Sequence, residues 1–216
     1  MNLLLIYGFP RGGTSAVAGA LSAAGFNLGL VADANTPTPA GRSAYRTFEC
    51  GDYIRVWKHR KPPGGGPSDQ YSPGGFGAFA EYIARRARMA GPQAVKRPGL
   101  HLWSCSPEWV DLPVVTLAVR RPIEDSVASN AYRRKTRTES GWAEHLGRMA
   151  ESMALFESQK PPVHVVNFYD LLADPESSIR GMLEAVEPFT GSPPGGWMIE
   201  RAVRSVDRRL VVKVPE

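Results

Sequence analysis

The sequence predicts an α/β fold with three layers, α/β/α, in which helices cover both faces of a mainly parallel sheet. Short continuous apolar runs, typical of strands buried on both faces, alternate along the chain with longer helical segments. This alternation favours a parallel sheet, because each parallel connection needs a crossover segment that is usually a helix. No internal repeat or linker divides the 216 residues, so one domain over residues 1–216 is expected.

The first predicted unit is a strand, a tight loop and a helix. Residues 3–7 form an apolar run that ends in glycine, which indicates a strand. After a Gly-rich turn, residues 14–24 carry almost only small side chains, with Val17 and Leu21 four residues apart. This spacing places both apolar side chains on one face of a helix that packs against the strand.

The next part of the chain is predicted to be mostly loop. Residues 27–44 are rich in Pro, Gly, Asn and Thr, and residues 45–58 favour no single type. Residues 61–77 contain two Pro/Gly clusters that we expect to prevent a helix or a central strand. They are predicted to be a long loop, either a mobile lid or a plain surface connection. A helical pattern resumes over residues 76–89.

Later apolar runs predict the remaining strands, at residues 94–95, 114–119 and 163–166. Pro122 suits the first turn of a helix, and Glu124 and Asp125 are favourable near its N-terminus. Asp174-Pro175 marks a further helix start. Each of these strands is therefore expected to lead into polar or helical residues.

Composition and charge limit the classes of function. Lys and Arg number 26 against 21 Asp and Glu, and the net charge of +5 suits an anionic partner. The basic clusters are neither interleaved with exposed aromatic residues nor placed on a recognisable reading helix, so no nucleic-acid partner is expected. No apolar run reaches the roughly 18 residues of a membrane span, and no secretory signal is evident, so a cytoplasmic protein is expected. Cys50 and Cys105 form no CxxC pair, and no metal site is predicted.

The densest chemical signal lies between the first strand and the first helix, at Gly8-Phe9-Pro10-Arg11-Gly12-Gly13-Thr14-Ser15. In such a place, backbone N–H groups and the positive helix end can hold an anion. The spacing G-x-x-x-x-G-T-S is that of a Walker A loop, but Thr14 replaces the lysine and Arg11 supplies a cation inside the loop. The sequence therefore predicts a P-loop NTPase-like fold whose anion site is not an ordinary ATP site.

A second cluster follows the strand predicted at residues 114–119, at Arg120-Arg121-Pro122-Ile123-Glu124-Asp125-Ser126-Val127-Ala128-Ser129. On the expected helix, Ser126 and Ser129 share one side, beside the arginines at the strand end. A surface helix with solvated charges is the alternative interpretation.

Both clusters resemble segments of the sulfotransferases that use 3′-phosphoadenosine 5′-phosphosulfate (PAPS). The first loop of that family has the form [PK or PR]-x-G-T-[ST] after a strand, and Pro10-Arg11-Gly12-Gly13-Thr14-Ser15 matches it. The resemblance implies that the loop holds the 5′-phosphosulfate of PAPS. It also implies that Arg11 stabilises the bridging oxygen as the sulfuryl group leaves.

The second cluster resembles the family's 3′-phosphate segment, R-x-P followed by a helical serine. Many relatives place the serine eight residues after the first arginine, whereas Ser129 is nine residues after Arg120 and eight after Arg121. The resemblance implies that Ser129 and one of these arginines bind the 3′-phosphate. Which arginine is the ligand stays open.

Weaker agreement extends the resemblance over most of the chain. Residues 25–29 and 46–49 resemble the G-x-x-x-G and F-E features of some bacterial members, and residues 165–175 resemble their Y-E-D-L-x-x-D-P segment. The adenine segment of the cytosolic animal enzymes is not evident, so no adenine contacts are predicted.

A second cation and a base complete the expected site. Val95-Lys96-Arg97-Pro98 resembles the family's K-x-[PH] segment at a strand end, which implies that Lys96 is the cation. His101 lies five residues further on, and histidine is a good proton acceptor at neutral pH. Glu49 is the other candidate, because some carbohydrate sulfotransferases use a glutamate. The simpler interpretations are a packed histidine near Trp103 and an exposed glutamate.

These features predict a transferase that moves a sulfuryl group from PAPS to a hydroxyl or amine without a metal ion. The acceptor is expected to be a small molecule, a carbohydrate or a lipid. One alternative is a P-loop nucleotide-dependent kinase, which the missing Walker lysine disfavours. Another is a non-catalytic binder of polyanions. No motif identifies the acceptor or the oligomeric state.

Overall fold

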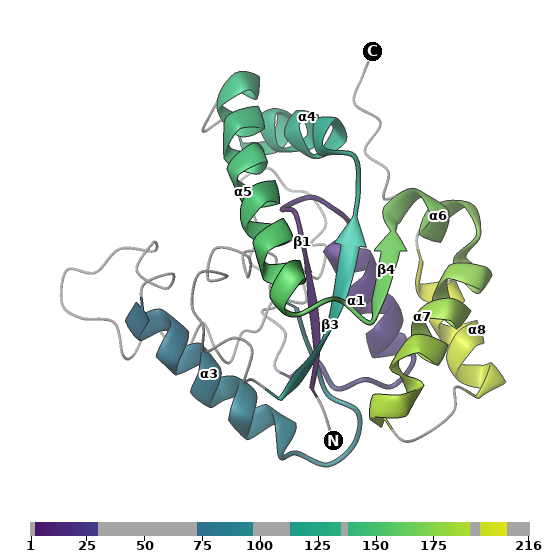
Figure 1. Cartoon of the computed structure of the whole chain (residues 1–216). Coiled ribbons are helices and arrows are strands. Elements are labelled where there is room, and N and C mark those ends of the chain that lie inside the picture. Colours follow the sequence, from purple (N-terminus) through teal and green to yellow (C-terminus); the bar gives the residue numbers. More distant parts are fainter. Residues whose placement is uncertain (1–2, 30–72, 97–112, 135–137, 191–194, 207–216) are drawn as a thin grey trace, which may run out of the picture.

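The computed structural model of the chain contains a parallel four-stranded sheet between two layers of helices (Figure 1). It describes residues 3–29, 73–96, 113–134, 138–190 and 195–206. Across the sheet the strands are ordered β2 (Ala94–Lys96), β1 (Leu3–Gly8), β3 (Val114–Arg120) and β4 (His164–Asn167). All neighbouring strands are parallel. The predicted three-layer α/β fold is confirmed.

The central strand β1 is buried along its whole length because helices cover both of its faces. Its odd-numbered residues Leu3, Leu5 and Tyr7 belong to a core cluster with residues of α3 (Pro73–Ala87) and α5 (Glu139–Gln159). Leu4 and Ile6 belong to a second cluster, with residues of α1 (Thr14–Ala23), α7 (Pro175–Thr190) and α8 (Gly196–Ser205). A strand buried on both faces has no polar positions, which explains its continuous apolar sequence.

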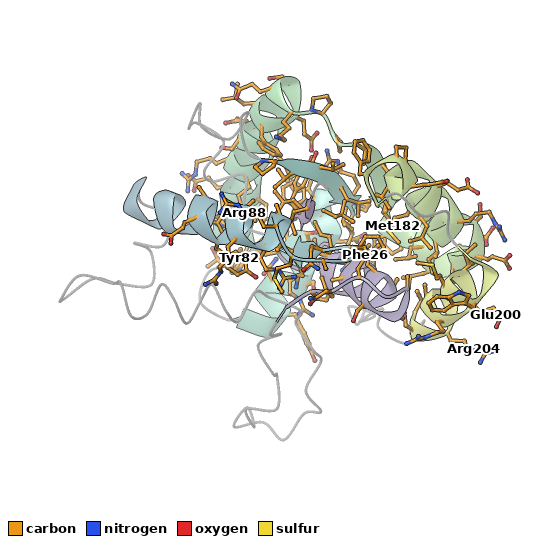
Figure 2. The ribbon with its side chains drawn as sticks, turned by 90° about the horizontal axis from the view of Figure 1, so that it is seen from below. Phe26, Tyr82, Arg88, Met182, Glu200 and Arg204 are labelled. Atoms are coloured by element: carbon orange, nitrogen blue, oxygen red, sulfur yellow. The ribbon has the colours of Figure 1, made fainter. Side chains whose placement is uncertain are left out.

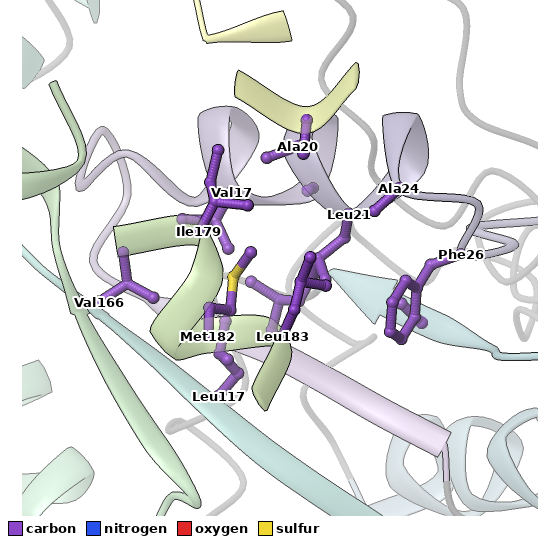
Figure 3. Packing of buried hydrophobic residues seen from close by; sticks show 14 of the residues in the cluster. Val17, Ala20, Leu21, Ala24, Phe26, Leu117, Val166, Ile179, Met182 and Leu183 are labelled. Carbon is purple, nitrogen blue, oxygen red and sulfur yellow. The ribbon is translucent and has the colours of Figure 1, made fainter. Parts of the chain in front are cut away.

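The second core cluster lies between the sheet, α1 and α7 (Figure 3). Val17 and Leu21 of α1 are fully buried there, as their spacing predicts. Figure 3 shows Ile179, Met182 and Leu183 of α7 in the same cluster. The short loop between Gly8 and Thr14 places the N-terminus of α1 beside the end of β1.

Two later helices begin where the sequence predicts a helix start. Helix α4 (Ile123–Arg134) follows Pro122 directly, and α7 begins at Pro175. A short helix, α6 (Phe168–Ala173), lies between β4 and α7 and was not predicted. Its six residues are too few for a helical periodicity to appear in the sequence.

Helix α3 corrects one prediction. It begins at Pro73, so the expected loop over residues 61–77 is wrong for its last five positions, and residues 61–72 lie outside the described part of the chain. Proline is tolerated at the first helical position because the N–H group there lacks an intrahelical partner in any case. The glycines after it lower helix propensity without preventing the helix.

Charged residues on the outer helices form pairs at a spacing of four. Arg204 and Glu200 project from α8 and lie 3.5 Å apart (Figure 2), and α5 and α7 each carry a similar pair. Such exposed pairs contribute only about 0.3–0.5 kcal/mol each. Within the described ranges, no helix is both long and apolar enough to cross a membrane.

Candidate functional site

The two predicted anion-binding clusters lie together at the carboxyl edge of the sheet. Strands β1 and β3 pair in parallel from Leu3 opposite Val114 to Gly8 opposite Val119. The segments that follow them therefore leave the sheet side by side. In open α/β sheets, ligands bind outside the carboxyl ends of the strands. A Cβ atom at Gly8 would lie 2.6 Å from the Val119 carbonyl oxygen, so only glycine permits this close strand pairing.

The loop after β1 has a left-handed backbone at two positions. Gly13 has a φ of 92°, and Arg11, with a φ of 66°, is the one non-glycine residue with positive φ in the described part of the chain. The Gly12 N–H donates to the Phe9 carbonyl at 2.9 Å and closes the turn. Left-handed conformation costs roughly 1–2 kcal/mol for a residue with a side chain. Strain of this kind collects at functional sites when surrounding contacts maintain it.

The side chain of Arg11 reaches the helix after β3. Its Nε donates to Ser129 Oγ of α4 at 3.4 Å, and Ser129 is buried. The cation of the first cluster and the serine of the second, predicted separately, therefore lie in one site.

Arg120 lies on the face of the sheet that α5 covers, opposite the face that α1 covers, and Glu157 of α5 holds it there. Its guanidinium forms an ion pair with that carboxylate, which also accepts a hydrogen bond of 2.7 Å from the Tyr7 hydroxyl. Burial raises the pKa of Tyr7, and the hydrogen bond with Glu157 raises it further. Glu157 thus neutralises the charge of Arg120 on the side of the sheet where α5 packs.

Arg121 lies against the loop. Its NH1 donates to the carbonyl of Arg11 at 3.1 Å, and its guanidinium carbon is 5.3 Å from the ring centroid of Phe168 and 5.7 Å from that of Tyr169. Tyr169 in turn donates to Asp125 of α4. Burial raises the pKa of Tyr169, and the hydrogen bond with Asp125 acts in the same direction. Of the two adjacent arginines, Arg121 is the one beside Arg11.

Lys96 brings a further cation to the same edge from the end of β2. Its side chain is almost fully buried, and Nζ donates to Ser15 Oγ in the first turn of α1 at 2.8 Å. Thr14, which occupies the position of the Walker lysine, is buried as well. Sequence positions 11–15, 96, 121 and 129 thus surround the N-terminus of α1.

Both candidate bases lie outside the described residues. These are His101 and Glu49, within the ranges 97–112 and 30–72. Their roles remain predictions. Among the described residues, no three His, Cys, Asp or Glu side chains gather in a way that could hold a metal ion.

Two residues of the site had no signal in the sequence. Asn130 of α4 is fully buried, and its Nδ2 donates to the Pro10 carbonyl at 3.0 Å. Glu157 lies 37 residues from Arg120. Neither residue belongs to a motif recognised in the sequence, so only the tertiary contacts reveal its role.

Comparison with known proteins gives a likeness of fold. No family model matches the sequence, and no curated protein matches it. Among solved structures, sulfotransferase STF1 from Mycobacterium tuberculosis H37Rv aligns with a TM-score of 0.52 at 14% identity, over 93% of this chain and 70% of that chain. Retinol dehydratase, in complex with androsterone and inactive cofactor PAP, aligns with a TM-score of 0.48 at 12% identity, over 95% of this chain and 64% of that chain. The chain therefore shares the α/β fold of STF1.

Proposed function

We propose that this chain is a sulfotransferase that moves a sulfuryl group from PAPS to a hydroxyl or amine of an acceptor. The observation that carries the proposal is the contact of Arg11 Nε with Ser129 Oγ at 3.4 Å, beside a loop of Walker A spacing that lacks the Walker lysine. The fold shared with STF1 supports the same class of reaction. One domain over residues 1–216 would contain the whole site.

The chemistry follows from where charge develops. The acceptor oxygen or nitrogen attacks sulfur, and the bond from sulfur to the bridging oxygen breaks. The electron pair stays on the 5′-phosphate, and the acceptor proton passes to a base. Such a transfer has a loose transition state, so positioning and cationic stabilisation of the leaving oxygen dominate the rate. We assign that stabilisation to Arg11.

The backbone of the loop and the first turn of α1 would hold the phosphosulfate. The first N–H groups of a helix have no intrahelical partners, and the positive end of the helix dipole favours an anion. Lys96 adds a positive charge beside the first turn of α1, because its Nζ lies 2.8 Å from Ser15 Oγ. Because the Lys96 side chain is buried, solvent screens its charge less than that of a surface lysine.

We assign the 3′-phosphate to Arg121 and Ser129. Arg121 NH1 is 3.1 Å from the Arg11 carbonyl, and Ser129 accepts from Arg11 Nε, so both lie near the same loop residue. Arg120 is committed to Glu157 on the other face. Releasing it would leave a carboxylate of low exposure without its ion-pair partner.

The base is proposed to be His101 or Glu49. Variants His101→Ala and Glu49→Gln should differ sharply in transfer rate, with one nearly inactive yet still able to bind the donor nucleotide. Rates are to be measured with saturating PAPS and nucleotide binding by calorimetry. If both variants keep full turnover, neither residue is the base and Lys96 is the next candidate.

The polyanion alternative needs an exposed basic surface, and the described residues argue against one at α3. The basic run of residues 85–88 is divided, because Arg86 is 3% exposed and its NH2 donates to the Asn27 carbonyl at 2.6 Å. Arg88 is exposed, and Arg85 packs on Tyr82, 5.9 Å from its ring centroid. On α8, Arg204 is paired with Glu200.

Donor titration by calorimetry tests the proposal. The full chain should bind adenosine 3′,5′-bisphosphate with defined 1:1 stoichiometry and more tightly than ATP with magnesium. Preference for ATP with magnesium would favour the kinase. Binding of heparin without any defined nucleotide stoichiometry would favour a polyanion binder.

A further inference from the structure

We propose that Asn130 is a positioning residue of the donor site, which maintains the left-handed backbone of Arg11. The inference rests on the proposed function, because Arg11 is the residue that the reaction uses. Asn130 is fully buried on α4, one residue after Ser129. It lies 120 residues from the loop that it contacts.

The side-chain amide of Asn130 connects α4 to the loop. Nδ2 donates to the Pro10 carbonyl at 3.0 Å and to the Ser126 carbonyl, one turn earlier in α4, at 2.8 Å. The bond to Ser126 orients the amide on its own helix, and the bond to Pro10 reaches the loop. Because carbonyl oxygens only accept hydrogen bonds, the NH₂ group is the part of the side chain that can satisfy both.

This contact acts on the conformation of the next residue. The Pro10 carbonyl and the Arg11 N–H belong to one planar peptide, so holding the oxygen sets the direction of the N–H. The peptide after Arg11 is held too, since Arg121 NH1 donates to the Arg11 carbonyl at 3.1 Å. The φ of 66° at Arg11 therefore lies between two peptides that are fixed by side chains from outside the loop.

Helix α4 thereby positions Arg11 twice. Asn130 holds the backbone before Arg11, and the adjacent Ser129 accepts from the Arg11 side chain at 3.4 Å. A residue with a side chain leaves the left-handed region readily when nothing holds it there. Without Asn130, we expect Arg11 to adopt other backbone conformations.

Two backgrounds that differ only in backbone freedom test this role. Arg11→Ala and Arg11→Gly both remove the guanidinium, but alanine is strained at this φ and glycine is not. Asn130→Ala should weaken binding of adenosine 3′,5′-bisphosphate by roughly 5–30-fold in the Arg11→Ala chain, which is the left-handed cost converted to affinity. In the Arg11→Gly chain it should have little effect. Calorimetry on the full chain measures all four affinities.

Control variants separate positioning from loss of fold. Tyr132→Ala removes a 48% exposed side chain from the same helix and should leave binding unchanged. Asn130→Leu keeps the buried volume without the donor, and in the otherwise intact chain it should weaken bisphosphate binding and slow hydrolysis of PAPS by water. Urea unfolding shows that each variant is folded before it is titrated.

The outcomes distinguish the inference from the proposed function. Equal losses in the Arg11→Ala and Arg11→Gly backgrounds would overturn the role of Asn130, and so would unchanged binding and hydrolysis in Asn130→Leu. Either result leaves the sulfotransferase proposal standing. Failure of the intact chain to bind the bisphosphate would refute the proposed function itself.

Discussion

Replacing Arg121 with alanine should weaken binding of adenosine 3′,5′-bisphosphate by about 10–150-fold if this guanidinium holds the 3′-phosphate. The range corresponds to one lost charge-assisted hydrogen bond, which contributes about 1.5–3 kcal/mol. Arg121 lies 3.1 Å from the Arg11 carbonyl and packs 5.3 Å from the Phe168 ring centroid, so its side chain is already oriented beside the loop. A pre-oriented side chain loses little conformational entropy when the phosphate binds, which favours the upper part of the range.

Calorimetric titration with two nucleotides isolates the effect. Adenosine 5′-phosphate lacks the 3′ group, so Arg121→Ala should weaken its binding less than that of the bisphosphate, by only the loss that comes from the contact with the Arg11 carbonyl. Because Arg121 also contacts the Arg11 carbonyl, a general loosening of the loop would instead weaken both nucleotides alike. Arg121→Lys keeps the charge but loses the planar fork, and an intermediate loss is expected.

The neighbouring variant Arg120→Ala is the matched control. The Arg120 and Glu157 side chains are 29% and 21% exposed. Removing the arginine should lower the free energy of unfolding by about 1–3 kcal/mol, because the carboxylate keeps only the Tyr7 hydroxyl among its described partners. The ratio of the two nucleotide affinities should stay the same. A selective loss of bisphosphate in Arg120→Ala, and not in Arg121→Ala, would refute the assignment.

Three further predictions concern the loop and the stability of the fold. Arg11→Ala should lower the transfer rate with saturating donor by roughly 10²–10³, as for removal of an oxyanion donor, and an unchanged rate would contradict its role. Gly13→Ala should destabilise by more than about 1–2 kcal/mol, because φ is 92° there and a Cβ atom would lie 2.2 Å from the Phe168 ring. In contrast, Gly147→Ala in α5, where a Cβ atom meets nothing within 4 Å, should raise the free energy of unfolding by up to about 1 kcal/mol. The urea midpoints of the two glycine variants test this difference. Burial lowers the pKa of His164 of β4, so the unfolded chain binds this proton more readily and stability should fall as pH drops below about 6.5. His164→Gln should reduce that dependence in urea unfolding at pH 7.5 and 5.5, and an unchanged slope would exclude His164 as its source.

The first strand, the loop and helix α1 could be predicted from sequence because each depends on near neighbours. The apolar run of β1, the glycines of the turn and the small residues of α1 are local patterns, and the structure has them in that order. Pro122 marked the start of α4 for the same reason. Local patterns failed at Pro73, where proline and glycine stand in the first turn of α3 rather than in a loop.

The sequence by itself determined that Arg120 and Arg121 come directly after the apolar run of a buried strand, and side chains of consecutive residues in an extended backbone point to opposite faces. Only the tertiary structure decided which face each one meets. Val119 of β3 lies in the cluster with α1, whereas Ala118 lies in the cluster with α5, so Arg120 meets Glu157 and Arg121 meets the loop. Those partners lie 37 and 110 residues away along the chain. The pleat of a strand is a local property, but the helices that cover each face are set by long-range packing, and this packing brings Asn130 to Pro10 as well.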